Sequence, residues 1–367
     1  MEKNSHKLIN LANKSFSEIL TDGFKLFLQS YRTLIIPLAL FQILLIVLNV
    51  LLLTDLSWQI DTIGINIPDL MEKFIQDESL TESELNTLIY FLFMTIVLLF
   101  LQNLIGAVVI TIAMCSVSNY VFRRYMDEDV SFVKSFKSAF NKKIFLVILI
   151  IGIFLPLGAV LFYIPAIIIF GFFIFLIFTY NMEIDKSPIS EARAIAKGAF
   201  WKIIGVFVVN ILLILIIDYI FTLIIDFFIV NESTVPIINS WYNPLTRNFG
   251  MLILYNILYS IIDIFFAPLF ICLLTVLFSS LKAKKELKIQ YQEGYYPERE
   301  LYQESYRILR QQPLDAMESE ASTSFPEIGT QNRFYCPFCG TLIQSPKKYC
   351  PKCGESLKFF QINNEKE

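Results

Sequence analysis

Four cysteines near the C-terminal end of the chain have the residue type and spacing of a metal site. Cys336 and Cys339 form one pair and Cys350 and Cys353 the other, each within the pattern Cys-Pro-x-Cys-Gly. In such a turn proline stiffens the bend and glycine allows a positive φ, so both thiolates face one side. Four thiolates suit a closed tetrahedral Zn²⁺ site, in which no coordination position is left for water. The spacing therefore predicts one structural zinc ion rather than a catalytic one.

Two other uses of these cysteines stay open at this point. A tetrathiolate site also accepts iron, and four close cysteines can form disulfides in an oxidising compartment. The predicted membrane topology puts them in the reducing cytosol, which favours metal binding. The paired turns resemble the short zinc-ribbon modules attached to many prokaryotic membrane proteins, which implies a zinc ribbon over 334–360. The negative charge of the tetrathiolate site offsets most of the nearby lysines, which argues against nucleic acid and favours a protein partner.

Polar side chains inside apolar segments are the second group that could do chemistry, because an ionisable group in hydrocarbon is costly and usually functional. The candidates are Gln102, Asn103, Asp218 and Asp263. Counted from the basic inner ends of the spans, all four fall near the outer edge of the hydrocarbon core. They either line a solvated outer bundle or form a polar cluster that faces an outward cavity and binds a cation, a proton or a lipid head group. Asn210 lies nearer the midplane, where a lone Asn is typical of a hydrogen bond between helices.

The sequence contains no catalytic constellation. The single histidine, His6, excludes mechanisms that need two imidazoles. Neither a phosphate-binding glycine loop nor a His-Glu-x-x-His motif occurs. Cys115 and Cys272 lie within apolar segments and are interpreted as small buried residues. We therefore expect no enzymatic activity.

Apolar segments long enough to cross a membrane must position these residues. The chain is 55% apolar and 17% charged, with a mean hydropathy of +0.58, and is more apolar than soluble domains are. The third of its apolar segments has 37 residues without a charge and contains Pro156 and Gly158, which predicts two spans joined by a turn near these residues. Since a span needs about 20 residues, six transmembrane helices are predicted from the segments 34–53, 88–122, 144–180, 203–230 and 251–281.

The charges of the connecting segments predict the orientation of these helices. Segment 54–87 holds eight acids and one base, whereas basic residues gather at 123–143, 181–202 and 282–288. By the positive-inside rule the first segment is outside and the other three are cytoplasmic. The uncharged third segment lies between two cytoplasmic ones, so it must cross an even number of times. We expect a multi-pass protein of the cell membrane, embedded in the lipid bilayer, with both termini in the cytoplasm.

Amphipathic segments precede the first, third and fifth spans, at 16–28, 130–140 and 187–200. Ser187 and Pro188 supply a good N-cap and a proline at the first helical position. We expect short interfacial helices with their apolar sides in lipid, so that three units each consist of an interfacial helix and a hairpin of two spans. Their mutual similarity reflects either an internal repeat or the general likeness of amphipathic segments.

Two of these segments carry a family resemblance. The stretch Phe16–Leu34 resembles the opening of the glycerophosphoryl diester phosphodiesterase membrane-domain family and its six-span relatives, and Ser190–Lys202 resembles their segment before the fifth span. The resemblance covers about Phe16–Lys285 and implies a six-span fold and a membrane location. In the enzymes that name the family, catalysis belongs to a separate soluble barrel with paired histidines. This chain has only His6, so the resemblance does not extend to phosphodiesterase activity.

These patterns divide the chain into four regions. An N-terminal cytosolic segment with an interfacial helix covers 1–32, a membrane domain 33–282, a polar helix with a flexible linker 283–333, and the zinc ribbon 334–360. The predicted fold class is an all-α integral membrane protein with a small C-terminal zinc ribbon. The leading hypothesis for its function is a non-enzymatic adaptor or membrane-organising protein that binds a cytosolic partner through the ribbon. The alternative is a transporter or channel for a small solute, ion or lipid, and a membrane enzyme comes third.

Overall fold

The computed structural model of the chain describes residues 8–64, 67–76, 81–161, 163–182, 187–230, 233–292, 334–335 and 342–343. The chain divides into two compact units, Phe16–Phe278 and a second made of Met1–Ser15 with Ser279–Glu367. Helices make up nearly all of the described residues, and the strands among them are β1 (Phe334–Tyr335) and β2 (Leu342–Ile343). The prediction of an all-α membrane part is confirmed.

Four of the described helices are long and apolar enough to cross a membrane, and a bent helix pair raises the number to five. The four are α2 (Phe16–Gly64), α4 (Glu82–Tyr125), α11 (Phe200–Ile229) and α14 (Ile261–Gln292). Only 17–22% of the most apolar stretches of α2, α4 and α11 is buried within the protein, against 56% for α14. Apolar surface of this extent requires lipid rather than water around it. These helices place the chain in a membrane, with α14 as the most enclosed of them.

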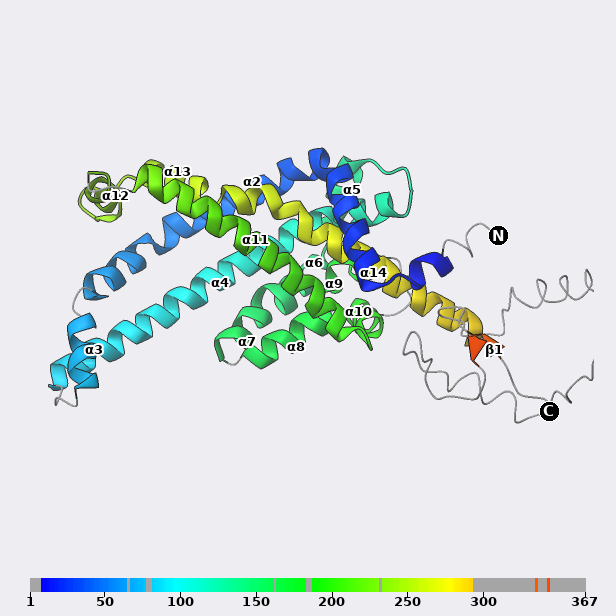
Figure 1. Cartoon of the computed structure of the whole chain (residues 1–367), viewed down its shortest axis with the longest axis horizontal. Coiled ribbons are helices and arrows are strands. Elements are labelled where there is room, and N and C mark those ends of the chain that lie inside the picture. Colours follow the sequence, from blue (N-terminus) through cyan, green and yellow to red (C-terminus); the bar gives the residue numbers. More distant parts are fainter. Residues whose placement is uncertain are drawn as a thin grey trace, which may run out of the picture. The chain divides into compact units, whose positions relative to one another are not determined.

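The helices α2 and α4 are much longer than one crossing requires. They contain 49 and 44 residues, or about 73 and 66 Å of helix at 1.5 Å per residue, against a hydrocarbon core of about 30 Å. The two helices lie side by side, and the short helix α3 (Ile67–Ile75) connects their distal ends (Figure 1). Their distal parts therefore extend well beyond the hydrocarbon of a bilayer.

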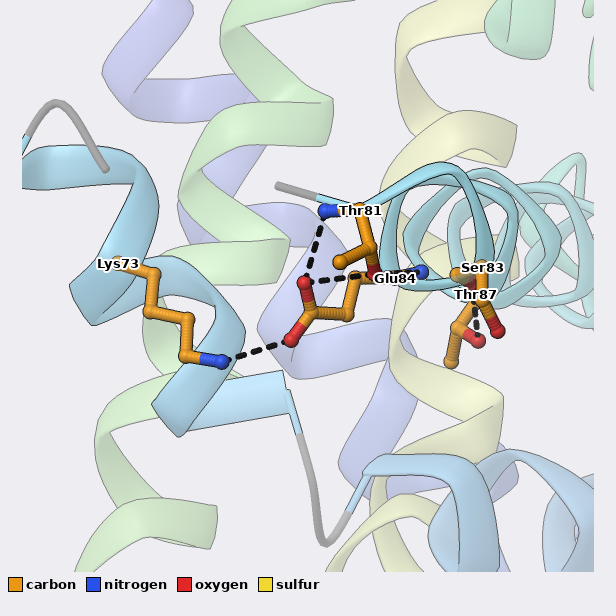
Figure 2. A network of polar contacts seen from close by, with 5 residues as sticks. All are labelled: Lys73, Thr81, Ser83, Glu84 and Thr87. Atoms are coloured by element: carbon orange, nitrogen blue, oxygen red, sulfur yellow. Dashed lines mark hydrogen bonds and ion pairs between the residues drawn. The ribbon is translucent and has the colours of Figure 1, made fainter. Parts of the chain in front are cut away.

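The distal corner between α3 and α4 is held by one carboxylate, Glu84 (Figure 2). Thr81 caps α4: the Glu84 N–H donates to Thr81 Oγ1 at 3.3 Å and the Thr81 N–H donates to Glu84 Oε2 at 2.9 Å, which together form a capping box. The Thr81 hydroxyl also donates to Glu84 Oε2 at 2.9 Å. Lys73 of α3 donates from Nζ to Glu84 Oε1 at 2.7 Å. The Lys73 ammonium and the Thr81 donors lower the pKa of Glu84 to about 2. The acid-rich connection between α2 and α4 thus ends in an ordered, charge-paired corner.

Two of the three predicted interfacial helices are separate elements. Helix α5 (Phe132–Ala139) is bent by 69° from the helix that begins with α6 (Ile144–Val147). Helix α10 (Pro188–Ala196) is separated from α11 by Gly198, whose φ of 82° is left-handed. As predicted, the side chain of Ser187 caps α10, accepting from the Ser190 N–H at 3.3 Å.

The first predicted interfacial helix is instead the beginning of α2, which continues without interruption to Gly64. Figure 1 shows this dark-blue part of α2 running at an angle to the rest, and Pro37 inside the helix accounts for a bend because it removes a backbone N–H. Its buried face holds Ile19, Gly23 and Leu26, and Gly23 packs directly against Leu273 of α14. Of the predicted apolar face, Ile19 is covered by protein, whereas Leu28 is 73% exposed, so protein covers this face only in part.

The uncharged third segment forms a helical hairpin, but its turn lies later than predicted. The first arm runs through α6, the π-helix η1 (Ile148–Phe154) and α7 (Leu155–Leu161), and α8 (Tyr163–Phe173) and α9 (Leu176–Thr179) form the second. Pro156 and Gly158 lie inside the first arm, because a π-helical turn directly before Pro156 accommodates its missing N–H. A Cβ on Gly158 would lie 3.0 Å from the Ala166 nitrogen, so this glycine permits close approach of the two arms.

The last apolar segment is broken at Ser260 into α13 (Phe249–Tyr259) and α14, and α12 (Val235–Tyr242) precedes them. Leu252 of α13 packs with Ile46 and Val50 of α2. Between α12 and α13, Arg247 forms an ion pair with Asp55 of α2 at 2.6 Å. The apolar segment 251–281 is thus two helices, and the part of it that is long enough to cross a membrane begins at Ile261. Apolar residues flank Ser260 on both sides, so hydropathy carries no signal of the break.

Candidate site among the apolar helices

A cavity of about 190 Å³ lies between α2, α4, α11 and α14. Aliphatic and aromatic side chains form most of its wall. The polar residues that line it are Gln42 of α2, Asn210 of α11 and Asp263 of α14. At about 30 Å³ per molecule, the cavity could hold roughly six waters or one small organic ion. Three polar groups on three helices thus converge on one apolar chamber.

Asn210 is the most enclosed of the three polar residues. It is the eleventh residue of α11, about 15 Å along the helix from its start, and its exposed fraction is 6%. Its Oδ1 atom is buried and has no hydrogen-bond partner in the described part of the chain. The sequence-based interpretation, a hydrogen bond between helices, therefore does not hold for this oxygen. Instead, the Asn210 side chain belongs to the cavity wall.

Asp263 reaches the cavity because the chain breaks just before it. Since Ser260 interrupts the last apolar segment, Asp263 falls in the first turn of α14. A carboxylate is favourable there, where the helix macrodipole is positive. Asp218 of α11 is close enough for its charge to act on Asp263. Among the described residues Asp263 forms no ion pair, so its charge faces the cavity without a protein cation beside it.

The four residues predicted as a polar cluster do not gather around this cavity. Of these, Asp263 lines it, and Asp218 is a half-buried electrostatic neighbour of Asp263. Gln102 and Asn103 lie on α4 with exposed side chains, and Asn103 donates to the Leu99 carbonyl of its own helix at 2.7 Å. Gln102 and Asn103 therefore do not line this cavity, and their exposed side chains fit the alternative of a solvated outer bundle.

Gln42 and Asn210 are the cavity residues that the predicted cluster left out. Both are single polar residues inside apolar segments, which is the signal that identified the other candidates. Depth and helical phase, which the sequence leaves undetermined, decide which of these polar residues meet.

A separate polar network ties the distal helices together. Tyr259, at the end of α13, donates its hydroxyl to Asp226 near the end of α11. The ring of Tyr255 contacts those of Tyr259 and Trp241, with centroids 4.7 and 6.3 Å away. Tyr242, the last residue of α12, lies beside this network, and burial is the main cause that raises the pKa of its hydroxyl above the ordinary value. Together with the Arg247–Asp55 pair, this network fixes α12 and α13 to their neighbours.

The predicted metal ligands Cys336, Cys339, Cys350 and Cys353 lie outside the described residues. Within the described ranges, no group of three or more His, Cys, Asp or Glu is arranged to hold a metal ion. The strands β1 and β2 pair antiparallel on either side of the segment 336–341, with Phe334 opposite Ile343 and Tyr335 opposite Leu342. Cys115 and Cys272 are buried free thiols, as predicted.

Comparison with known proteins gives no family assignment: neither a family model, nor a curated protein, nor a solved structure matches the chain. The resemblance based on Phe16–Leu34 and Ser190–Lys202 stays a prediction. The function is therefore inferred from the chain's own residues.

Proposed function

We propose that this chain is a non-enzymatic multi-pass membrane protein that holds a zinc ribbon at the cytoplasmic face and uses it to bind a cytosolic protein. The observation that carries the proposal is the β1–β2 pairing around 336–341, attached to a chain whose long helices require a membrane. An adaptor needs these two parts, an anchor and a small recognition module.

The membrane part of the proposal has six spans arranged as three hairpins. The helices α2 and α4 form the first hairpin, the arms of 144–161 and 163–179 the second, and α11 with α13–α14 the third. The separate helices α5 and α10, together with the angled beginning of α2, support an interfacial element before each hairpin. The resemblance to the glycerophosphoryl diester phosphodiesterase membrane-domain family favours the same arrangement.

The zinc part of the proposal assigns Cys336, Cys339, Cys350 and Cys353 as ligands of one structural Zn²⁺. In the β1–β2 hairpin, Tyr335 and Leu342 are paired and the intervening segment must turn back within six residues. A Cys-Pro-Phe-Cys-Gly turn fits that space and points two thiolates to one side. A module of about 25 residues buries too little apolar surface to fold alone, so the metal would supply most of its folding free energy.

The cytoplasmic surface of the proposed anchor is basic. Lys134 and Lys137 on α5 are exposed, and with the lysines at 282–288 of α14 they fit the anionic inner leaflet. The ribbon would therefore be held close to the membrane surface. A closed tetrathiolate zinc has no position for substrate or water, which favours recognition of a protein over catalysis.

Metal analysis of the purified full-length protein tests the first part of this proposal. One zinc per chain is expected, falling to none when Cys336 and Cys350 are both replaced by serine. The control replaces Cys115 and Cys272 by alanine, which removes the same number of thiols from the buried helices and should leave the zinc in place. Iron in the unmodified protein, or an unchanged zinc content in the first variant, would overturn the assignment.

The adaptor role is tested by comparing cross-linked partners of the same two variants. A cytosolic protein should be cross-linked to the unmodified chain and to the Cys115→Ala/Cys272→Ala control, but not to the Cys336→Ser/Cys350→Ser variant. Equal recovery from all three would show that the ribbon does not recruit it.

A further inference from the structure

The chamber between α2, α4, α11 and α14 has the composition of a ligand site rather than of a packing defect. Cavities that form by imperfect packing of apolar helices are lined by apolar groups and stay empty. This one receives a buried Asn210, a carboxylate from Asp263 and an amide from Gln42. A buried polar group without a partner is destabilising. A ligand in the cavity would stabilise the protein by donating a hydrogen bond to Asn210 Oδ1.

The Asp263 carboxylate indicates that the ligand in this cavity is positively charged. Within the described residues this carboxylate has no protein cation beside it, and the nearby Asp218 adds repulsion. The Asp263 side chain is exposed, so its carboxylate is charged and accessible, and a cation at short range in the cavity would be attracted to it. Asn210 Oδ1 is also an acceptor, so a positively charged group with several N–H donors would satisfy both residues.

The aromatic side chains that line the cavity indicate the uncharged part of the ligand. Phe41, Phe266 and Phe270 line the same cavity, and aromatic faces attract cations and pack against hydrocarbon alike. A bare metal ion would leave most of this wall uncovered and would find few oxygen ligands. An ammonium group attached to a small apolar body fills both the polar and the apolar parts.

From these contacts we infer that the cavity is a binding site for a small amphiphilic ammonium ion, with Asp263 and Asn210 holding the ammonium group and the phenylalanines holding its apolar body. The site lies entirely within Phe16–Phe278. It is therefore independent of the zinc ribbon and of the adaptor function.

Calorimetric titration of the full-length protein in lipid nanodiscs tests this inference with a matched pair of probes, phenethylammonium and its neutral analogue 2-phenylethanol. Phenethylammonium should bind at least about tenfold more tightly, a difference of about 1.4 kcal/mol. Equal affinity for both probes would mean that the chamber accepts any apolar molecule, such as a lipid chain, and would overturn the inference, as would absence of phenethylammonium binding.

Variants then locate the probe. Asp263→Asn should lower the affinity for phenethylammonium to that of the alcohol, and Asn210→Leu should weaken it by about tenfold. The matched control is Asn103→Leu, which makes the same exchange on an exposed face of α4 and should leave binding unchanged. Full binding in Asp263→Asn, or a loss in Asn103→Leu equal to that in Asn210→Leu, would contradict the site. The probe comparison on the unmodified protein decides the question even if a variant fails to fold.

Discussion

At the scale of single residues, close helix contacts in this protein depend on glycines that meet a neighbouring backbone. A Cβ on Gly23 would lie 2.5 Å from Leu273 Cδ2 and 3.1 Å from Leu273 Cα. The side chain could rotate away, but the Cα belongs to the backbone of α14 and cannot move without shifting the helix. Gly106 of α4 has no atom within 4 Å of the same position.

Gly23→Ala should therefore destabilise the protein by about 1–3 kcal/mol, the usual cost of overpacking. Gly106→Ala is the control and should be neutral or slightly stabilising, because alanine favours helix over glycine. Thermal unfolding of the purified proteins in one detergent measures both. If the two variants unfold at the same temperature, the contact between α2 and α14 is not as close as described.

Tyr180 carries a second prediction at this scale. Its side chain is fully buried, and its hydroxyl lies 3.2 Å from the Cys115 carbonyl and 3.1 Å from the Ala139 carbonyl. Ala139 ends α5, where carbonyl groups have no partner within the helix. Tyr180→Phe keeps the ring but removes the donor, and should cost about 1–3 kcal/mol of stability.

The control for this change is Tyr163→Phe, since Tyr163 is 79% exposed and should tolerate the loss of its hydroxyl. Thermal unfolding again provides the measurement. Faster hydrogen exchange in α5 of Tyr180→Phe would show that the lost donor anchors this helix to the bundle. An unchanged unfolding temperature would contradict the role assigned to the hydroxyl.

Residue types alone predicted which side chains are candidates, but not which of them meet. Ser187 and Pro188 were sufficient to predict a capped helix, because a cap depends on local sequence. Asn103 and Asn210 are the same residue in similar apolar surroundings, yet one bonds its own helix and the other lines a cavity. That difference is set by the rotation of each helix against its neighbours, which is a tertiary property.

At the scale of elements, the α3–α4 corner predicts a local response to pH. The pKa of Glu84 is lowered from 4.5 to about 2 by Lys73 and Thr81. A carboxyl group whose pKa is depressed in the folded state contributes its stability above the unfolded value and loses it as pH falls through the folded value. The contact should therefore be intact above about pH 4.5 and lost toward pH 2.

Nuclear magnetic resonance titration of the Glu84 carboxyl carbon in the full-length protein tests this expectation. The midpoint should lie near 2 in the unmodified protein and rise toward 4.5 in Lys73→Met, which removes the largest of the causes. Lys25→Met is the control, because Lys25 pairs with Asp22 in another part of the chain. A midpoint near 4.5 in the unmodified protein would mean that the corner does not form.

The elements were predictable where charge or local turn chemistry marks their ends. Helices α5 and α10 are flanked by polar residues and were predicted at nearly their observed positions. The amphipathic beginning of α2 was also recognised, but amphipathicity does not tell whether lipid or protein covers the apolar face, since both are apolar. The turn between α7 and α8 and the break at Ser260 lie inside apolar sequence, where hydropathy is uniform and packing decides.

At the scale of the whole molecule, the charge distribution predicts which side each corner faces. The α3–α4 corner follows the acidic segment and should be outside, whereas the basic segment at 142–143 should be inside. Ser83→Cys in this corner should react with a membrane-impermeant maleimide on intact cells, and Lys142→Cys should react only after permeabilisation. Both positions are exposed. The unmodified chain is the blank, since two of its cysteines are buried and the other four are predicted to be cytoplasmic. The reverse pattern would invert the topology.

The same labelling decides between four and six crossings, because the hairpin of 144–179 crosses the membrane either twice or not at all. The arms 144–161 and 163–179 contain 18 and 17 residues, or about 27 and 26 Å of helix, close to the lower limit for a core of about 30 Å. If both arms cross, the tip of the hairpin just reaches the outer interface. Tyr163→Cys, at the beginning of the second arm, should then react from outside the cell, with Lys142→Cys as the inner reference. If the hairpin is instead a re-entrant loop that returns partway, Tyr163→Cys would stay unlabelled on intact cells, and the membrane domain would have fewer than six spans.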